Sequence, residues 1–189
     1  MRIQQALLLA TFVLVGASAI HADPPPATKE TKTPALDPEH ARLSGMAGTW
    51  DVEMTFWFKP GQPGVATKAT STIRPLFNGL FVEEKIEGTL NGSPFTTLAW
   101  TGYNPTTHQY EATRIATTNP ARIAEAGSYD PKTQRFELKA EYPLAGDTWH
   151  QRTVIEAVST SKMTAASYLS FGKVPEWKAV ELKYTRRSE

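Results

Sequence analysis

Beyond residue 49 the chain alternates between apolar and polar side chains. In residues 50–58 every second residue is large and apolar, and the same alternation returns in residues 136–142 and 178–184. A period of two is typical of a strand with one buried face. The residues that this pattern predicts on the inner face include Trp50, Val52, Met54, Phe56, Phe136, Leu138, Tyr142, Leu182 and Tyr184.

Short clusters of Gly, Pro, Asn, Asp and Ser separate the alternating stretches. Asn-Gly is the strongest hairpin signal among them, because both central positions of its turn take a positive φ. Nine turns and no helical period follow Trp50, which predicts ten antiparallel strands. The turns lie at residues 60–64, 78–79, 91–92, 104–106, 119–120, 130–133, 145–147, 159–161 and 172–175.

The spacing of the turns selects the architecture. Turns recur about every 14 residues and leave strands of roughly 9 to 11 residues, which is long for a sandwich. Long neighbouring hairpins without crossovers favour an up-and-down barrel, which has no exposed edges. We therefore predict an all-β fold, an up-and-down antiparallel barrel of about ten strands with a short N-terminal plug helix.

An outer-membrane barrel is the alternative with the same strand pattern. It would turn charged strand residues such as Glu53, Lys139 and Glu141 toward lipid, at up to roughly 2–4 kcal/mol each. The charged outer face therefore predicts that water surrounds the barrel.

Residues 1–22 have the pattern of an export signal. Arg2 supplies the basic start, residues 6–15 are apolar, and the small residues 17–19 offer a cleavage site, with Ala22 as a second candidate. An uncleaved anchor is the alternative, but the apolar run is short for a span of roughly 20 residues. We predict an exported protein, periplasmic or extracellular, without stable membrane insertion after signal cleavage.

The barrel is predicted to follow a tether. Residues 23–41 form a Pro-rich tether and the start of a helix, with Asp37 as N-cap and Pro38 at the first helical position. The helix is expected to end at Ser44, before Gly45. The β-barrel domain then occupies residues 42–189.

Composition and charge narrow the range of functions. The chain has 189 residues, of which 40% are hydrophobic and 21% charged, as expected for one domain with a real core. Without the leader, basic residues number 20 − 1 = 19 against 19 acidic ones, so nucleic acid is a poor partner. The absence of cysteine excludes disulfides, thiolate metal sites and a Cys nucleophile. The oligomeric state stays open.

The start of the predicted barrel resembles a known superfamily. Residues 48–50, Gly-Thr-Trp after a short helix, resemble the Gly-x-Trp opening of lipocalins and their calycin relatives. The resemblance implies that an Arg at the last strand packs across this Trp50. Parity places Arg186 on the face of Leu182 and Tyr184, so we expect Arg186 over Trp50, a contact worth roughly 0.5–2 kcal/mol.

A closer resemblance covers residues 43–186. They are similar to a bacterial family named domain of unknown function fifteen seventy-nine, which implies a lipocalin-like barrel and no established substrate. Arg114 departs from the family, in which an aromatic residue is expected at this position. The similar blocks are residues 46–61, 78–88, 94–104, 125–131 and 152–156.

Few side chains suggest catalysis. No histidine pair has the spacing of a metal site, so we predict neither metal nor cofactor, and His150 is the one histidine expected to face the interior. Glu84 shares the face of inward apolar residues and needs a cationic partner, either Arg114 or Arg152. The parity of both arginines is open, because Ile115 lies on the opposite face from Arg114 and Ile155 on the opposite face from Arg152, and each isoleucine competes for the interior.

The prediction for function is a module that binds a small, largely apolar ligand inside the barrel. One alternative is an enzyme that uses Glu84, His150 and Arg152, although no Gly-x-Ser-x-Gly elbow is present. Another is an interaction protein of the cell envelope. The predicted ligand-binding residues are Met54, Phe56, Glu84, Trp100, Arg114, Tyr142, His150 and Arg152, and the structural pair is Trp50 and Arg186.

The export signal predicts the mature N-terminus. Expressed with its own leader in a Gram-negative host, the chain should be recovered outside the cytoplasm and begin at Ile20 or Asp23, because small residues precede both bonds. N-terminal sequencing and intact mass measure this directly. A full-length product that starts at Met1 and sediments with the membrane would contradict it.

Overall fold

A computed structural model describes residues 36–188, so the predicted leader and most of the tether lie outside the described part. In this range one short α-helix precedes ten strands, and a single 3-10 turn interrupts them. The elements are α1 Pro38–Ser44, β1 Gly48–Phe56, β2 Val65–Leu76, η1 Phe77–Gly79, β3 Phe81–Leu90, β4 Ser93–Asn104, β5 Gln109–Ala116, β6 Asn119–Asp130, β7 Arg135–Leu144, β8 Asp147–Ser159, β9 Lys162–Phe171 and β10 Val174–Arg186.

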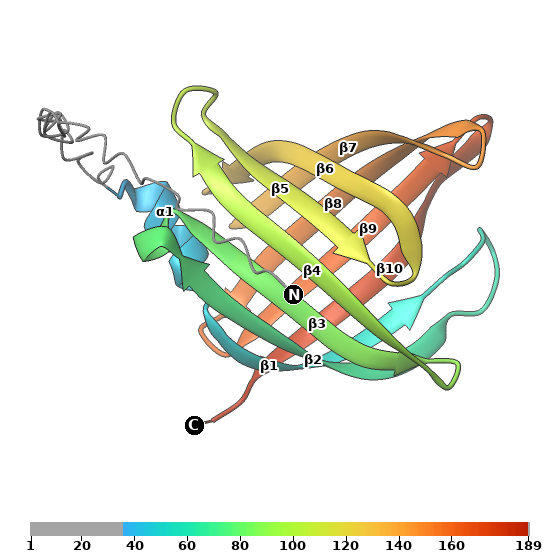
Figure 1. Cartoon of the computed structure of the whole chain (residues 1–189), viewed down its shortest axis with the longest axis horizontal. Coiled ribbons are helices and arrows are strands. Elements are labelled where there is room, and N and C mark those ends of the chain that lie inside the picture. The colour runs from blue at the N-terminus through green and yellow to red at the C-terminus, as the bar shows by residue number, and fades with distance from the viewer. Residues whose placement is uncertain (1–35, 189) are drawn as a thin grey trace, which may run out of the picture. The chain divides into compact units, whose positions relative to one another are not determined.

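The ten strands form a closed up-and-down barrel (Figure 1). Each strand pairs antiparallel with the next, and β1 pairs with β10 from Trp50 opposite Arg186 to Phe56 opposite Val180. This confirms the predicted all-β barrel with its N-terminal helix. None of the described helices is long and apolar enough to span a bilayer.

The turns follow the predicted chemistry with one difference. Asn91 and Gly92 both take positive φ, 51° and 81°, as an Asn-Gly hairpin requires. The turn expected at residues 119–120 instead lies at residues 117–118, and Asn119 already pairs with Ala116. Asn119 belongs to β6 because its side-chain oxygen accepts a hydrogen bond from the Ala121 N–H within the strand.

The alternation sorts the core as predicted. Trp50, Val52 and Met54 are buried on β1, and Phe56 is half-buried at its end. Phe58 does not continue this inner row. It is 55% exposed and stacks on Phe56, because β1 ends at Phe56.

The end of the barrel at the start of β1 is closed by α1. Asp37 caps the helix by accepting hydrogen bonds from the N–H groups of Glu39 and His40. Leu43 on the same helix is almost completely buried, and Tyr110 of β5 donates a hydrogen bond to the Glu39 carboxylate. That hydrogen bond, together with Arg42, lowers the pKa of Glu39. The helix is therefore fixed to the barrel by both apolar and polar contacts.

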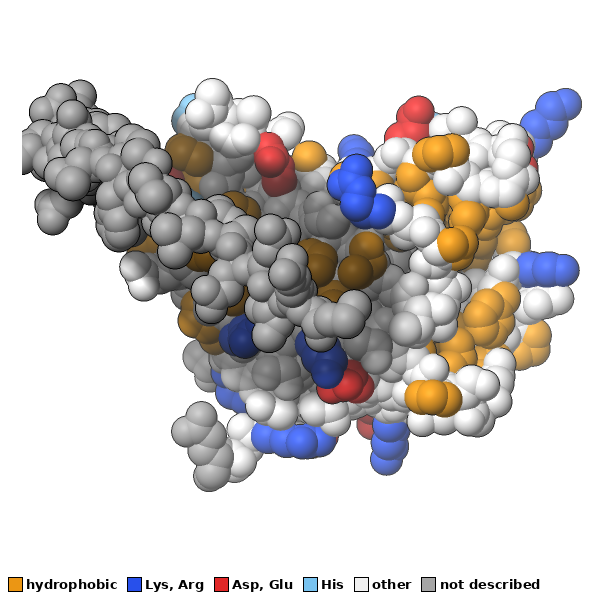
Figure 2. Space-filling view, in the orientation of Figure 1, with side chains coloured by type: hydrophobic (Ala, Val, Ile, Leu, Met, Phe, Trp, Pro, Cys, Tyr) orange, Lys and Arg blue, Asp and Glu red, His pale blue; other side chains and the backbone are white. Residues whose placement is uncertain are grey.

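The opposite end is rich in aromatic side chains. Phe56 contacts Phe95 edge to face, and the rings of Trp149 and Phe171 stack with their centroids 4.3 Å apart. Trp177 completes this group and donates a hydrogen bond to the backbone oxygen of residue 57. Figure 2 shows hydrophobic side chains gathered on the right of the molecule, over strand ends away from α1.

Arg186 covers the Trp50 ring, which is the contact that the resemblance to lipocalins implies, made by the arginine that strand parity selects. Its guanidinium carbon lies 4.1 Å from the ring centroid, and the indole nitrogen donates to the backbone oxygen of Met46. The guanidinium also donates to the backbone oxygens of Thr160, Ala47 and Gly45. One side chain thus joins the last strand, the β8–β9 turn and the segment that follows α1.

This arrangement predicts that Arg186→Ala lowers the free energy of unfolding by about 2–3 kcal/mol, because a cation–π contact and charged hydrogen bonds are lost together. Urea denaturation followed by tryptophan fluorescence measures the change. The matched control is Arg187→Ala, whose exposed side chain pairs with Asp51 and should leave the midpoint unchanged. Equal effects of the two substitutions would refute the role of Arg186.

Candidate functional site

The barrel is closed but one of its ladders is short. β6 and β7 pair over five residues, from Ala126 opposite Lys139 to Asp130 opposite Arg135. In Figure 1 the two strands lie together near α1 and diverge toward the other end. In the described pairing, Asn119 and residues 123–125 pair with β5 and residues 140–144 pair with β8, with no partner across the gap. We call this opening the seam.

Proline marks both sides of the seam. Pro120 lies in the unpaired half of β6 and Pro143 in the unpaired half of β7. Proline has no backbone N–H and is confined to strand edges, strand starts and bulges. The two residues are therefore compatible with an interrupted ladder at this place.

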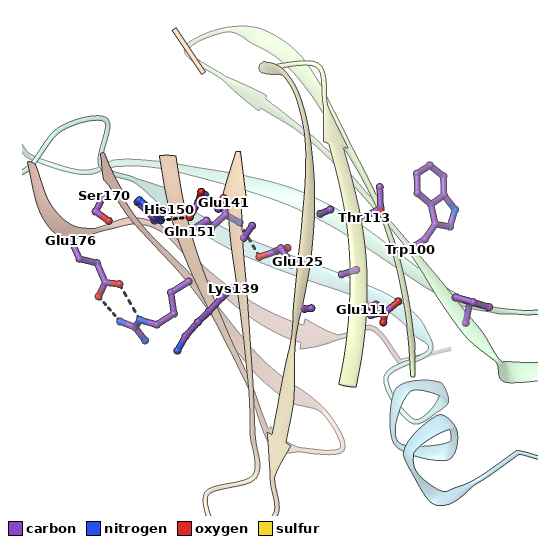
Figure 3. Close-up of a pocket in the computed structure, with 16 residues that line it drawn as sticks. Trp100, Glu111, Thr113, Glu125, Lys139, Glu141, His150, Gln151, Ser170 and Glu176 are labelled. Carbon is purple, nitrogen blue, oxygen red and sulfur yellow. Dashed lines mark hydrogen bonds and ion pairs between the residues drawn. The ribbon is translucent and has the colours of Figure 1, made fainter. Parts of the chain in front are cut away.

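A cleft of about 910 Å³ opens at the seam (Figure 3). Its volume falls in the range of roughly 300–1,000 Å³ that is usual for small-molecule sites. Four of its lining residues point inward, namely Ala112, Glu125, Ala140 and Gln151. The others lie on outward or rim positions: Phe81, Trp100, Glu111, Thr113, Ala124, Ala126, Lys139, Glu141, His150, Arg152, Ser170 and Glu176.

Polar side chains meet at the floor of this cleft, inside the barrel. The Gln151 amide donates to the Glu125 carboxylate over 3.0 Å, and the Thr153 hydroxyl donates to the same oxygen. Arg114 Nη2 lies 3.6 Å from the other oxygen of Glu125. The Glu125 side chain is 0% exposed. We call Arg114, Glu125, Gln151 and Thr153 the polar layer.

The charge of Arg114 is maintained by its neighbours. Burial disfavours the guanidinium charge, but Glu125 and Glu84 outweigh this effect, and the pKa of Arg114 is raised. Tyr142 donates a hydrogen bond to Gln151, and burial followed by the Glu125 charge raises the pKa of this phenol. The polar layer is therefore an ion pair with neutral hydrogen-bonding groups around it.

Glu84 forms a second inward cluster beside the polar layer. Its carboxylate accepts hydrogen bonds from Ser71 at 2.8 Å and from the Tyr184 hydroxyl at 3.1 Å. Burial, and next the Glu84 charge, raise the pKa of Tyr184 well above its usual value. In the strand register Ala99 stands between Glu84 and Arg114, so a small side chain separates the two clusters.

An enclosed cavity of about 60 Å³ lies between the polar residues and α1. Arg114 and Thr153 line this cavity, whereas Glu125 and Gln151 line the cleft. Leu43 and Met46 contribute the wall on the helix side. The polar layer thus separates the inner cavity from the cleft at the seam.

Five of the eight predicted ligand-binding residues face the interior. Met54 and Tyr142 are buried, Phe56 is half-buried, and Glu84 and Arg114 belong to the two polar clusters. Of these five, Glu84 and Arg114 line the enclosed cavity. The open question of parity on β5 is settled in favour of Arg114, because its neighbour Ile115 is 40% exposed.

The other three predicted residues face outward, which corrects the expected inward position of His150 and Arg152. His150 pairs with Glu141 at 3.3 Å, and Arg152 pairs with Glu176 at 2.7 Å and stacks on Tyr168. On β8 the inner face belongs to Gln151, Thr153 and Ile155. Trp100 donates a hydrogen bond to the outward Glu83.

All three outward residues line the rim of the cleft, above the polar layer. Arg152 is therefore not the partner of Glu84. The expected cation inside the barrel is Arg114, and its closest acidic neighbour is Glu125.

Three residues of the site are absent from the predicted set: Glu125, Gln151 and Thr153. The signal that identifies Glu125 is alternation, because Ile123, Glu125 and Gly127 share one face of β6. Gln151 and Thr153 likewise share the face of Ile155. Among residues 36–188 no three His, Asp or Glu side chains gather as a metal site would require.

The closed up-and-down order of the ten strands defines a calycin-like barrel. Two solved structures have this fold. Rv2717c of M. tuberculosis aligns with a TM-score of 0.59 and 10% identity, over 82% of this chain and 100% of that chain. The S-type phycobiliprotein lyase CPES of Guillardia theta aligns with a TM-score of 0.53 and 10% identity, over 82% and 99%.

The chain belongs to the family described as protein of unknown function (DUF1579), which matches residues 35–186. The match confirms the resemblance seen in the sequence. No curated protein matches the chain significantly.

The polar layer predicts strong coupling between Arg114 and Glu125. Arg114→Leu should lower the free energy of unfolding by about 3 kcal/mol, because Glu125 keeps a buried charge without its cation. The double variant Arg114→Leu/Glu125→Leu should lose clearly less unfolding free energy than the two single variants lose in sum. Urea denaturation of the four proteins of this cycle gives the coupling energy. Additive losses would show that the pair is not a unit.

Proposed function

We propose that this protein binds a small, largely apolar molecule in the cleft at the seam. The observation that carries the proposal is the interruption of the β6–β7 ladder above the polar layer, which gives a ligand access to the interior from the side. A complete ladder would leave the same barrel without lateral access.

The shape of the cleft supports a ligand rather than a packed core. Ala112 and Ala140 stand beside Glu125 and Gln151 in the strand register, and a methyl group is all that each contributes to the wall. Phe81 and Trp100 add aromatic surface at one rim. An apolar body would lie between these groups with one polar end at the floor, and the polar side chains of the rim would surround its outer part.

The enzymatic alternative loses the residues on which it was based. It required Glu84, His150 and Arg152 to converge in one cleft. Glu84 lies inside the barrel next to Tyr184, whereas His150 and Arg152 pair with glutamates on the outside. The convergence that acid–base catalysis needs is not formed by this set.

The proposal includes the place of action. The leader-like pattern of residues 1–22 supports binding outside the cytoplasm, in the periplasm or the medium. The balanced charge of the remaining chain supports a small uncharged partner better than a nucleic acid.

A blocked cleft tests the proposal. Ala140→Phe should fill the cleft and weaken binding of the neutral probe N-phenyl-1-naphthylamine by at least about tenfold in a fluorescence titration. Ala66→Phe is the matched control, since Ala66 is exposed on β2 and lies outside the residues that line the cleft. It should bind the probe like the wild type.

Two results would overturn the proposal. One is the absence of saturable probe binding to the wild type, together with the absence of a co-purified small molecule in native mass spectrometry of protein from its own source. The other is that Ala140→Phe binds the probe as tightly as the wild type does, when thermal denaturation curves show that both proteins are folded.

A further inference from the structure

We propose that the polar layer selects a ligand whose polar end is neutral and both donates and accepts a hydrogen bond, such as an alcohol, and that it rejects a carboxylate. This inference rests on the proposed function, because it names the class of molecule that the same cleft takes.

The first argument comes from two buried atoms. Arg114 Nε and Glu125 Oε2 are buried and have no hydrogen-bond partner among residues 36–188. Such atoms are uncommon in folded proteins, because each loses its contact with water without a replacement. One is a donor and the other an acceptor.

The two atoms belong to side chains that form an ion pair. Nε belongs to the same guanidinium as Nη2, and Nη2 is 3.6 Å from Glu125 Oε2. A hydroxyl group that enters the polar layer from the cleft, where Glu125 lies, and extends to Arg114 on the cavity side accepts from the Arg114 N–H with its oxygen and donates its proton to Glu125. One neutral group thus satisfies both atoms.

The second argument is the balance of charge. Two acidic side chains, Glu84 and Glu125, face the interior around the single guanidinium of Arg114, and both act on its charge. A carboxylate ligand adds a third acid and brings its lone pairs against Glu125 Oε2, which it cannot satisfy. An amine satisfies Glu125 but meets the Arg114 N–H without an acceptor.

The remaining groups at the floor are already engaged. Gln151 donates to Glu125 and Thr153, and its oxygen accepts from Tyr142. The amide therefore does not compete for the head group. The selection rests on Arg114 and Glu125.

The basic side chains at the rim of the cleft do not favour a carboxylate over a hydroxyl group. Each basic side chain that lines the cleft already has a glutamate beside it among the described residues. The pairs are Lys139 with Glu137 at 3.2 Å, His150 with Glu141 at 3.3 Å and Arg152 with Glu176 at 2.7 Å. An incoming carboxylate must compete with these partners, whereas a hydroxyl makes no such demand.

The test compares three ligands with the same ten-carbon chain. 1-Decanol, decanoate and decylamine displace N-phenyl-1-naphthylamine from the full chain at pH 7.5, and the displacement gives their affinities. We expect 1-decanol to bind at least about tenfold more tightly than decanoate and more tightly than decylamine.

Glu125→Gln identifies the residue responsible. Replacement of the carboxylate by an amide of the same size should reduce the ratio of the affinities for 1-decanol and decanoate by about tenfold. Glu53→Gln is the matched control, because Glu53 is exposed on the outer face of β1 and should keep the wild-type ratio. Should Glu125→Gln fail to fold, the wild-type ratio decides alone.

The outcomes separate this inference from the proposed function. If decanoate or decylamine binds to the wild type as tightly as 1-decanol does, the head-group selection is overturned. The proposal that the cleft binds a small molecule then still stands. An unchanged ratio in folded Glu125→Gln removes the role of Glu125. No displacement by any of the three, with no binding of the probe itself, overturns both proposals.

Discussion

The pairing of β1 with β10 is the constraint on which the rest of the molecule depends. Without it the ten strands would form an open sheet with two free edges and no interior. Arg186 strengthens this closure, because it lies over Trp50 and bonds to backbone oxygens on both sides of the joint. The same contacts fix the position of α1. The segment that leads from α1 into β1 supplies two of the backbone oxygens that accept from Arg186, those of Gly45 and Ala47.

A closed barrel tolerates an interruption elsewhere, and the structure has one at the seam. The interruption coincides with the polar layer, so buried charge and lateral access occur at the same level. Buried ion pairs contribute little net stability, because desolvation offsets their attraction. Packing alone therefore does not account for Arg114 and Glu125, which agrees with the role in recognition that we propose for them.

Much of the fold could be predicted, because strand alternation and turn residues are local signals. The contact of an arginine with Trp50 was implied by the resemblance to lipocalins, and parity on the last strand identified the arginine as Arg186. His150 was expected inside and lies outside, and the parity of Arg152 stayed open, because charged and apolar residues on β8 allow either face to be the inner one. Only packing against neighbouring strands shows that Gln151 and Thr153 face inward. The seam depends on pairing between strands, which alternation within one strand does not encode.

The two prolines of the seam have a consequence for the kind of molecule that enters it. An unpaired strand edge ordinarily pairs with another strand, which a peptide or a second barrel would supply. Pro120 and Pro143 remove a backbone donor from each edge, and the charged side chains of Lys139 and Glu141 flank the β7 side. This arrangement opposes β-augmentation and agrees with the proposal that a small molecule, which has no polypeptide backbone, occupies the cleft.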